Sequence, residues 1–302
     1  MIVLGLPPGL LLTGRPGSFI PDPFRYDAPV ALALAVSTGP EFLSALRQEV
    51  RAHPGVGHSI LGRMTMDPRS RADFRILGEQ HYPLVTVFTR YLEILLLRAP
   101  DAEAKSWLAK VLVDEYGEGS RGLDHAALYR AFLRASGVPQ GDERRAHLHP
   151  AVSEFVLEHL RIVSEEPFLV GLGAVGPGHE WAIPEMFPWI VRGLKAAGFA
   201  EAEMEYFLLH VEQDKDHGAW LEEALQGFAS TPEACGQIRR GALLSLAARE
   251  QFWWGLADKL NARRMKERTG LAPSTEGSEA SETTLEALTE RIRPRISFGG
   301  KA

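Results

Sequence analysis

The chain has 302 residues, and its hydrophobic fraction of 45% is ample for a sizeable core. Its 33 basic and 39 acidic residues give a net charge of −6, which argues against nucleic acid or an anionic membrane as a partner. The single cysteine excludes a disulfide framework and a paired-cysteine zinc motif. The apolar stretch at residues 1–14 lacks a basic start and is too short to span a membrane, so we expect no signal peptide and a cytoplasmic location.

After an irregular Pro- and Gly-rich lead-in at residues 1–27, the pattern is helical almost throughout. Apolar residues at helical spacing predict helices at about 28–53, 70–98, 101–116, 122–136, 148–166, 184–197, 200–227 and 232–265. Alternating strand patterns bounded by turn residues are absent from the sequence. The sequence therefore predicts an all-α fold.

Two segments carry clear boundary signals. Thr231 and Pro232 mark a helix start, because a capping hydroxyl is followed by proline in the first turn. The polar composition of residues 274–284 is typical of a mobile linker. We therefore expect one helical domain at 28–268, followed at 269–302 by the linker and a loosely attached tail able to form a short helix.

His210, Asp214 and His217 occupy positions i, i+4 and i+7 of one predicted helix. At about 100° per residue, these offsets place the three side chains within roughly 60° of one another. Two imidazoles and a carboxylate on one face provide half of a site for a transition metal. Apolar neighbours such as Phe207 and Val211 indicate that this face points into the core, where unsatisfied polar groups are costly. The alternative is a helix with two unrelated histidines and a solvated acid.

A metal site in a helical bundle takes ligands from facing helices, so other segments must contribute. Residues 114–129 offer Glu115, Glu118 and His125. Glu118 and His125 are seven residues apart and would align on a straight helix, whereas Glu115 and His125 are ten apart. The three intervening glycines disfavour a straight helix by up to ~1 kcal/mol each, so both glutamates stay candidates. The plainer interpretation is a helix end, a loop and a capping Asp124 before a new helix.

Residues 171–187 offer a further carboxylate. A run of small residues leads to His179 and Glu180, and a new helix opens near Pro184. Glu180 has an aromatic and an apolar neighbour and is a candidate inward-facing ligand, whereas we expect His179 to be a loop residue. Glu185 is more simply explained as a first-turn acid that interacts favourably with the helix dipole.

The order of these motifs resembles the heme-oxygenase-like diiron oxidases and oxygenases, which are also described as iron-containing redox enzymes. The shared pattern is DE-x-G-x-G followed by a histidine, then a Gly-rich segment ending in a glutamate, then H-x3-D-x2-H. It covers roughly residues 70–260, and the last motif is its most specific part. The resemblance implies a heme-oxygenase-like bundle of about seven core helices that binds two iron ions and uses O2 as co-substrate.

The resemblance also implies a set of metal ligands, matched residue by residue. Apart from the first carboxylate, the implied ligands are His125, Glu180, His210, Asp214 and His217. The first carboxylate is ambiguous, because Glu115 fits the DE-x-G-x-G pattern and Glu118 fits a seven-residue spacing; we prefer Glu115. No catalytic residue beyond the metal ligands is expected.

In this family the predicted helix at 76–93 should line the substrate pocket, with His81, Tyr82 and Phe88 as candidate lining residues. Several polar residues lie along it: Glu79, His81, Thr89, Arg90 and Glu93. If these residues face the cavity rather than solvent, they favour a small amine or amino acid of specialised metabolism over a fatty acid. We therefore predict N-oxygenation of such a substrate. Desaturation or C–C cleavage of an amino acid or fatty acid is the alternative.

Other protein classes fit less well. A ferritin-like diiron protein would show Glu-x-x-His pairs on two helices, and the sequence has none. A thiaminase-like relative would need a cysteine nucleophile, but Cys235 lies between a helix start and a glycine, with no acid/base constellation nearby. Hydrolase, Walker and dinucleotide-binding motifs are absent. The alternative from another functional class is a non-catalytic helical scaffold. Whether the protein takes electrons from an external donor, and whether it forms a homodimer, is not decided by the sequence.

Overall fold

The structure, a computed structural model, describes residues 37–67, 69–270 and 283–296. Within these ranges the description excludes the side chains of residue 119 and of residues 212–219 and 294–296. The lead-in at 1–27, the first part of the helix predicted at 28–53 and residues 274–282 of the predicted linker lie outside the described residues.

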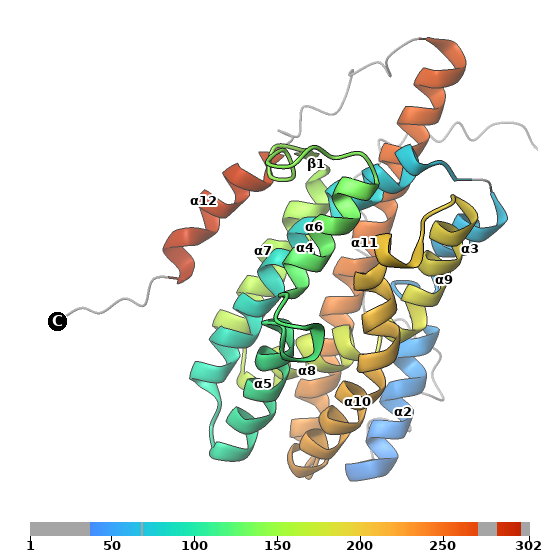
Figure 1. The fold of residues 1–302 in the computed structure, drawn as a ribbon. Helices are drawn as coiled ribbons and strands as arrows, with labels where there is room; N and C mark the ends of the chain where they lie inside the picture. The colour runs from blue at the N-terminus through green and yellow to red at the C-terminus, as the bar shows by residue number, and fades with distance from the viewer. Residues whose placement is uncertain (1–36, 68, 271–282, 297–302) are drawn as a thin grey trace, which may run out of the picture.

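The described elements are almost all helices, and Figure 1 shows the long ones running side by side as a bundle. In chain order they are α2 (Gly39–Ala52), α3 (Ser59–Met66), α4 (Arg71–Arg98), α5 (Ala102–Glu115), η1 (Glu118–Ser120), α6 (His125–Ala135), β1 (His147–Leu148), α7 (Pro150–Glu165), α8 (Phe168–Val175), η2 (Gly176–Glu180), α9 (Ile183–Ala196), η3 (Glu201–Glu203), α10 (Glu205–Phe228), α11 (Pro232–Thr269), β2 (Thr283–Thr284) and α12 (Leu285–Ile296). The prediction of an all-α fold is confirmed. No helix among the described residues is long and apolar enough to cross a membrane.

Side-chain caps set several helix starts. The backbone N–H of Ala234 donates to Oγ1 of Thr231 at 3.2 Å, so the start signal of α11 is confirmed. The backbone N–H of Ala127 donates to Oδ1 of Asp124 at 2.5 Å. Because Asp124 caps α6, His125 becomes the first residue of that helix and its orientation is fixed by the cap.

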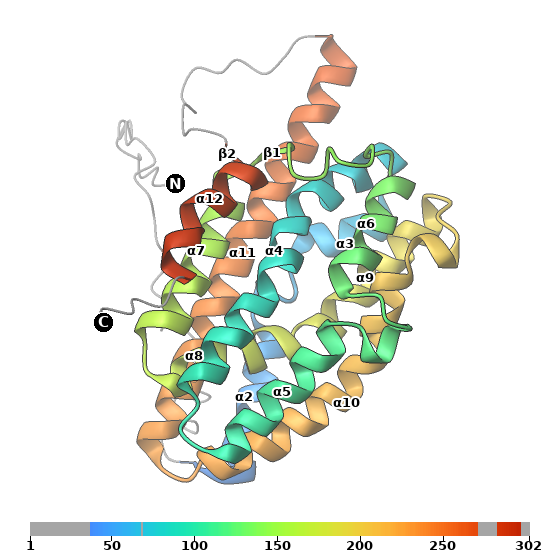
Figure 2. The same ribbon diagram turned by 60° about the vertical axis from the view of Figure 1, so that its left-hand side comes forward.

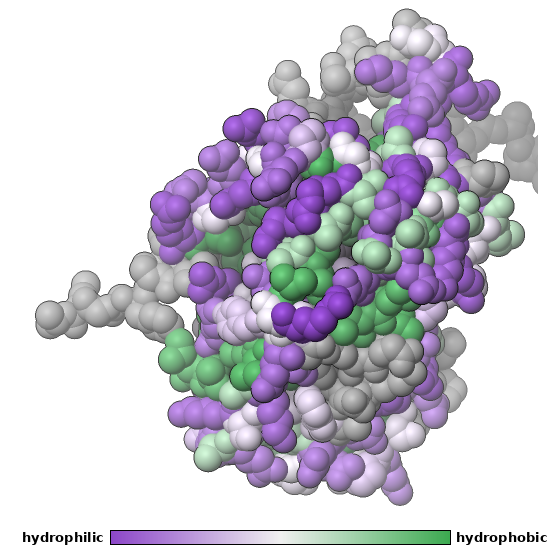
Figure 3. All heavy atoms as spheres, viewed as in Figure 1, coloured by the Kyte–Doolittle hydropathy of each residue, from purple (hydrophilic) through white to green (hydrophobic). Residues whose placement is uncertain are grey.

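The helices surround one aromatic and aliphatic core. Its largest fully buried side chains are Trp253, Tyr91, Tyr129, Phe42, Phe74, Phe132, Phe155, Phe187, Phe207 and Phe252. Figure 3 shows hydrophilic residues over much of one face, interrupted by hydrophobic areas near its middle. Amphipathic helices packed around one core bury their apolar faces in this way and leave their polar faces on the surface.

The small residues at 171–178 form helix α8 and the wide turn η2, where we expected an irregular segment. A Cβ on Gly241 of α11 would lie 1.9 Å from the carbonyl oxygen of Val170, and one on Gly173 would lie 2.0 Å from that of Ile238. The glycines are therefore needed because α8 and α11 pack backbone against backbone. This tertiary contact outweighs the poor helix propensity of glycine, which had argued against a helix here.

The tail forms the expected short helix, α12, which lies on the outside of the bundle in Figure 2. Leu285, Leu288 and Ile292 are buried along one side of it. Just before it, β2 pairs with β1 in antiparallel register, with His147 opposite Thr284. The described part of the tail is thus held on the domain by an apolar face and backbone pairing, which is closer attachment than we expected.

Candidate metal centre

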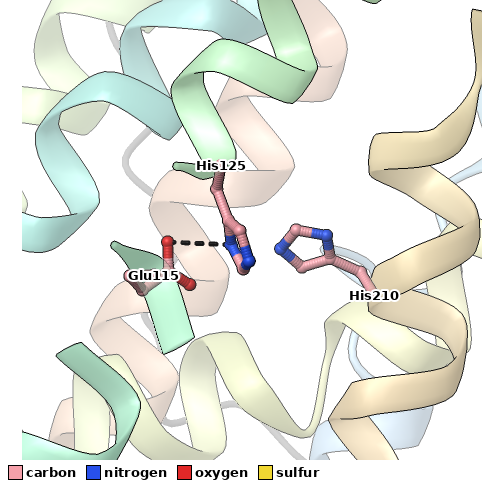
Figure 4. A group of neighbouring side chains, drawn as sticks. All are labelled: Glu115, His125 and His210. Atoms are coloured by element: carbon pink, nitrogen blue, oxygen red, sulfur yellow. Dashed lines mark ion pairs between the residues drawn. The ribbon is translucent and has the colours of Figure 1, made fainter. Parts of the chain in front are cut away.

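Three of the sequence-predicted ligands meet inside the bundle. Glu115 ends α5, His125 begins α6 and His210 lies in α10, and Figure 4 shows their side chains facing one another. All three are buried, with relative exposures of 6%, 2% and 5%. One ligand atom from each lies within 4.8 Å of the others, and Nδ1 of His125 is 3.0 Å from Oε2 of Glu115. The centroids of the two imidazole rings are 4.5 Å apart.

The loop between α5 and α6 brings Glu115 to His125. Gly117 has a φ of +107°, and a Cβ there would lie 2.8 Å from backbone atoms of Leu123, so only glycine fits without strain. Gly122 also has a positive φ, +80°. The chain therefore reverses sharply, and the last residue of one helix faces the first residue of the next.

The same loop separates the two candidate glutamates. Glu118 lies on η1 and is exposed, whereas Glu115 is buried beside His125. A spacing of ten residues is compatible with close approach because the intervening residues do not form a continuous helix. The geometry favours Glu115, the residue we preferred from the sequence.

His210 is held in one orientation by its own helix. Its Nδ1 lies 2.7 Å from the backbone carbonyl oxygen of Tyr206, one turn earlier. Because a carbonyl can only accept a hydrogen bond, Nδ1 carries the proton and donates it. The neutral ring then presents the lone pair of Nε2, which is the arrangement commonly found in metal-ligating histidines.

The remaining predicted ligands are placed in part. Glu180 ends η2, is 3% exposed and lines the same internal cavity as Glu115 and His210, although it is outside their close cluster. The backbone of α10 carries Asp214 and His217 about one and two turns after His210. Their side chains lie outside the described residues, so their place in a ligand set stays a prediction.

The cavity is small and lies beside this cluster. Its lining residues are His81, Leu84, Val85, Phe88, Glu115, His179, Glu180, Ile183, Phe187, Tyr206, His210 and Arg249. Of the three lining residues we expected, His81 and Phe88 are present. Tyr82 instead lines a separate hollow beside α12, with its ring 5.9 Å from that of Tyr129.

The polar residues of α4 mostly face the surface. Glu79 pairs with Arg75 at 2.8 Å, and Arg90 pairs with Glu93 at 2.5 Å, both at the exterior of the bundle. Of the five polar residues that we cited in favour of a polar pocket, only His81 lines the cavity. The polar character of this helix therefore gives no reason to prefer an amine over a fatty acid.

His179 is buried, and our expectation that it lies in a loop was wrong. Its Nδ1 lies 3.1 Å from the carbonyl oxygen of Ala174 and 3.3 Å from Oγ of Ser245. The Ser245 hydroxyl is also 2.9 Å from Nε2 of His159, whose Nδ1 lies 2.8 Å from the carbonyl oxygen of Phe155. In the consistent assignment the Nδ1–H of His179 is shared between the carbonyl of Ala174 and Ser245, Ser245 donates to His159, and His159 donates to Phe155, with both imidazoles neutral.

Burial keeps these imidazoles neutral. Desolvation lowers the pKa of His159 to about 3 and that of His179 well below 6.5, and the positive charge of Arg249 acts in the same direction. Desolvation and Arg249 likewise lower the pKa of His81 to about 3. We did not predict Arg249 as a cavity residue, although the sequence carries a signal for it. Three of the four residues that lie three or four places from it on α11 are apolar: Leu246, Phe252 and Trp253.

Comparison with known proteins supports the assignment made from the residues. A model of the family described as "iron-containing redox enzyme" matches residues 75–250. The chain belongs to this family. The match runs from α4 to the middle of α11, and so includes Glu115, His125, Glu180 and the H-x3-D-x2-H motif. Two imidazoles and a carboxylate are donors that suit non-heme iron, so the residues present fit the metal that the family name implies.

The chain is also similar to a curated protein, the 4-aminobenzoate synthase of Nitrosomonas europaea. The two are 26% identical over 181 residues, which cover 56% of this chain and 72% of the relative.

Solved structures share the fold at low identity. A TenA homolog from Pseudomonas syringae pv. tomato has a TM-score of 0.61 and 18% identity, covering 74% of this chain and 95% of the other. A domain of unknown function with a heme oxygenase-like fold from Shewanella denitrificans has a TM-score of 0.60 and 16% identity, covering 76% and 96%. A CadD-like protein of unknown function from Nostoc punctiforme has a TM-score of 0.60 and 18% identity, covering 72% and 96%. This chain has the heme-oxygenase-like fold.

Proposed function

We propose that this protein is an iron-dependent, O2-activating oxidoreductase that acts on a small nitrogen-containing substrate. The observation that carries the proposal is the buried cluster of Glu115, His125 and His210 beside an internal cavity. Three titratable groups that converge in the core are costly unless a ligand satisfies them. Iron held there would supply the redox chemistry with O2 that amino-acid side chains lack.

The proposed site holds two irons. Glu115, His125 and His210 would provide ligands, and Glu180, Asp214 and His217 would complete the set, as the resemblance implies. The chain itself contributes orientation and exclusion of water. The carbonyl of Tyr206 fixes the proton of His210 on Nδ1, and burial keeps bulk water from the cluster. The rings of Phe88 and Phe187 give the cavity apolar walls next to the polar groups.

For the reaction we keep N-oxygenation of an amine or amino acid as the first candidate. The polar residues of α4 face outward and so do not support a nitrogen-containing substrate. That support comes instead from the similarity to a protein named 4-aminobenzoate synthase. Desaturation or C–C cleavage of an amino acid is the second candidate, because the same name is compatible with a reaction that forms an aromatic amine by cleavage.

A substrate panel tests the proposal. The protein is loaded with Fe(II) without oxygen, and then O2 is added in the presence of single amino acids, aromatic amines or fatty acids. We expect about two irons per chain and O2 consumption that one nitrogen compound accelerates, with one oxygen atom gained by its nitrogen in the product mass. Loss of two hydrogens or of a carbon fragment would select the second candidate. A protein without stoichiometric iron or any O2-dependent absorbance change would instead be a scaffold.

Glu115→Ala is expected to reduce bound iron much more than Glu118→Ala. Glu115 is buried against His125, whereas Glu118 is exposed on η1. Loss of a direct ligand should weaken iron binding by more than the ~10–100-fold seen for groups that only support ligands. Iron per chain, measured on both variants after identical loading and gel filtration, checks this. The reverse order would mean that the loop rearranges and that Glu118 is the ligand.

A further inference from the structure

Arg249 is a buried cation without a counter-ion among the described residues. It lies on α11, it is 2% exposed, and its Nε has no hydrogen-bond partner in the described part of the chain. Elsewhere on α11, by contrast, Arg239 pairs with Glu49 and Arg240 pairs with Glu166. A charge removed from water without a partner costs several kcal/mol, by general estimates, so an unpaired guanidinium in a core calls for an explanation.

The groups that contact Arg249 do not supply a negative charge. Its guanidinium lies 5.2 Å from the centre of the Phe155 ring, a cation–π contact that compensates only part of the lost hydration. The histidines near it are neutral, because burial and Arg249 itself lower the pKa of His81, His159 and His179. Burial also lowers the pKa of Arg249, to about 10, so that it stays protonated at neutral pH.

Arg249 lines the same cavity as Glu115 and His210. A second buried polar atom without a partner among the described residues lines it too, Nδ1 of His81, and His81 is 5% exposed. These two side chains come from different helices, α11 and α4, and both reach one cavity. Two unsatisfied buried groups at one small cavity indicate a place for a ligand that accepts hydrogen bonds and carries negative charge.

We propose that Arg249 binds a carboxylate group of the substrate, with His81 as a second hydrogen-bond donor. Glu115 and Glu180 also line the cavity, but the proposed function assigns them to iron, so the positive charge of Arg249 is left for one carboxylate of the substrate, whose two oxygens fit the planar guanidinium. A phosphate dianion would need more positive charge, and Arg249 is the only lysine or arginine among the described residues that line the cavity. The substrate is therefore an amino acid or another amino carboxylate rather than a simple amine.

The orientation of the substrate, that is, which of its ends reacts, rests on the proposed function. The ring of Phe187 lies 6.2 Å from that of His81 and 5.6 Å from that of His210, so it stands beside both parts of the cavity. A substrate whose carboxylate is at Arg249 and His81 would pack its middle against Phe187. Its nitrogen-bearing end would then lie toward Glu115 and His210.

Matched acids and amides test the carboxylate site without turnover. The full chain is freed of iron with a chelator, because carboxylates also ligate iron. Binding of acetate and acetamide, benzoate and benzamide, and 4-aminobenzoate and 4-aminobenzamide is then measured by calorimetry and by the shift in Tm. In the unmodified protein at least one acid should bind about tenfold or more tightly than its amide, as expected for a buried ion pair. Equal binding within all three pairs overturns the proposal.

Variants assign the preference to Arg249. Arg249→Gln should bind the acid and the amide equally, and Arg249→Lys should keep part of the preference because it keeps the charge. Arg240→Gln is the matched control on the same helix, where an exposed arginine is replaced, and it should behave like the unmodified protein. An acid preference that survives in Arg249→Gln would contradict the assignment.

If acids are selected but iron does not bind, the carboxylate site stands and the proposed function fails. If iron and O2 chemistry occur without acid selection, the proposed function stands and the carboxylate site fails.

Discussion

Replacing His210 by alanine is expected to remove most of the iron from the protein and to abolish O2-dependent activity. The ring of His210 is buried 4.5 Å from that of His125, and its proton is fixed on Nδ1 by the carbonyl of Tyr206. Alanine leaves a space with no donor atom, so iron affinity should fall by more than about 100-fold. Iron per chain, measured by mass spectrometry of the metal after gel filtration, gives the result. His147→Ala, at an exposed position, is the control and should retain full iron.

The iron content of two further variants on α10 tests which face of this helix binds metal. His217→Ala should lose iron like His210→Ala, since the two positions are seven residues apart on one helix face. Asp216→Ala should change little, because position 216 is about 200° around the helix from position 214. Similar losses at 216 and 217 would show that the face of α10 which binds metal is not the one that carries His210.

Much of the fold followed from the sequence because helical periodicity and caps are local signals. The start of α11 at Thr231 and Pro232 and the cap of α6 at Asp124 are examples. Segment 168–180 was missed for a non-local reason. Its glycines are unfavourable in an isolated helix and become necessary only when α8 packs against α11. No inspection of that segment alone would reveal the contact.

The candidate site could be predicted in part. The spacing on α10 marked His210, but the choice between Glu115 and Glu118 depended on the positive φ angles of the loop, which sequence spacing does not give. Tyr82 was an avoidable error. His81 and Phe88 are seven residues apart and share a helix face, whereas Tyr82 is turned about 100° away and lines another hollow. Arg249 belongs to no motif, and its only local signal is a charge on a largely apolar face of α11.

The iron-free protein is expected to lose stability steeply as the pH falls below about 6. His81, His159 and His179 are buried as neutral imidazoles, and burial lowers their pKa values from 6.5 to about 3 for the first two and well below 6.5 for the third. Between the folded and unfolded values the unfolded chain binds more protons, so stability rises with pH. It is fully present above 6.5 and is lost as the pH falls toward 3. His81 and His159 each contribute a slope of about 1.4 kcal/mol per pH unit, or about 3 kcal/mol per unit together, and His179 acts in the same direction.

The slope from His81 and His159 alone would remove about 4 kcal/mol between pH 7 and pH 5, a large part of the ~5–15 kcal/mol typical of a folded domain. Urea unfolding of chelator-treated protein at several pH values measures it. His159→Gln isolates one contribution, because glutamine can still donate to Phe155 and accept from Ser245 but does not titrate. Its slope should be smaller by about one proton, whereas His147→Gln at the surface should leave the slope unchanged. An unchanged slope in His159→Gln would mean that this histidine is protonated in the folded core, and the hydrogen-bond chain through Ser245 would then have to run in the opposite direction.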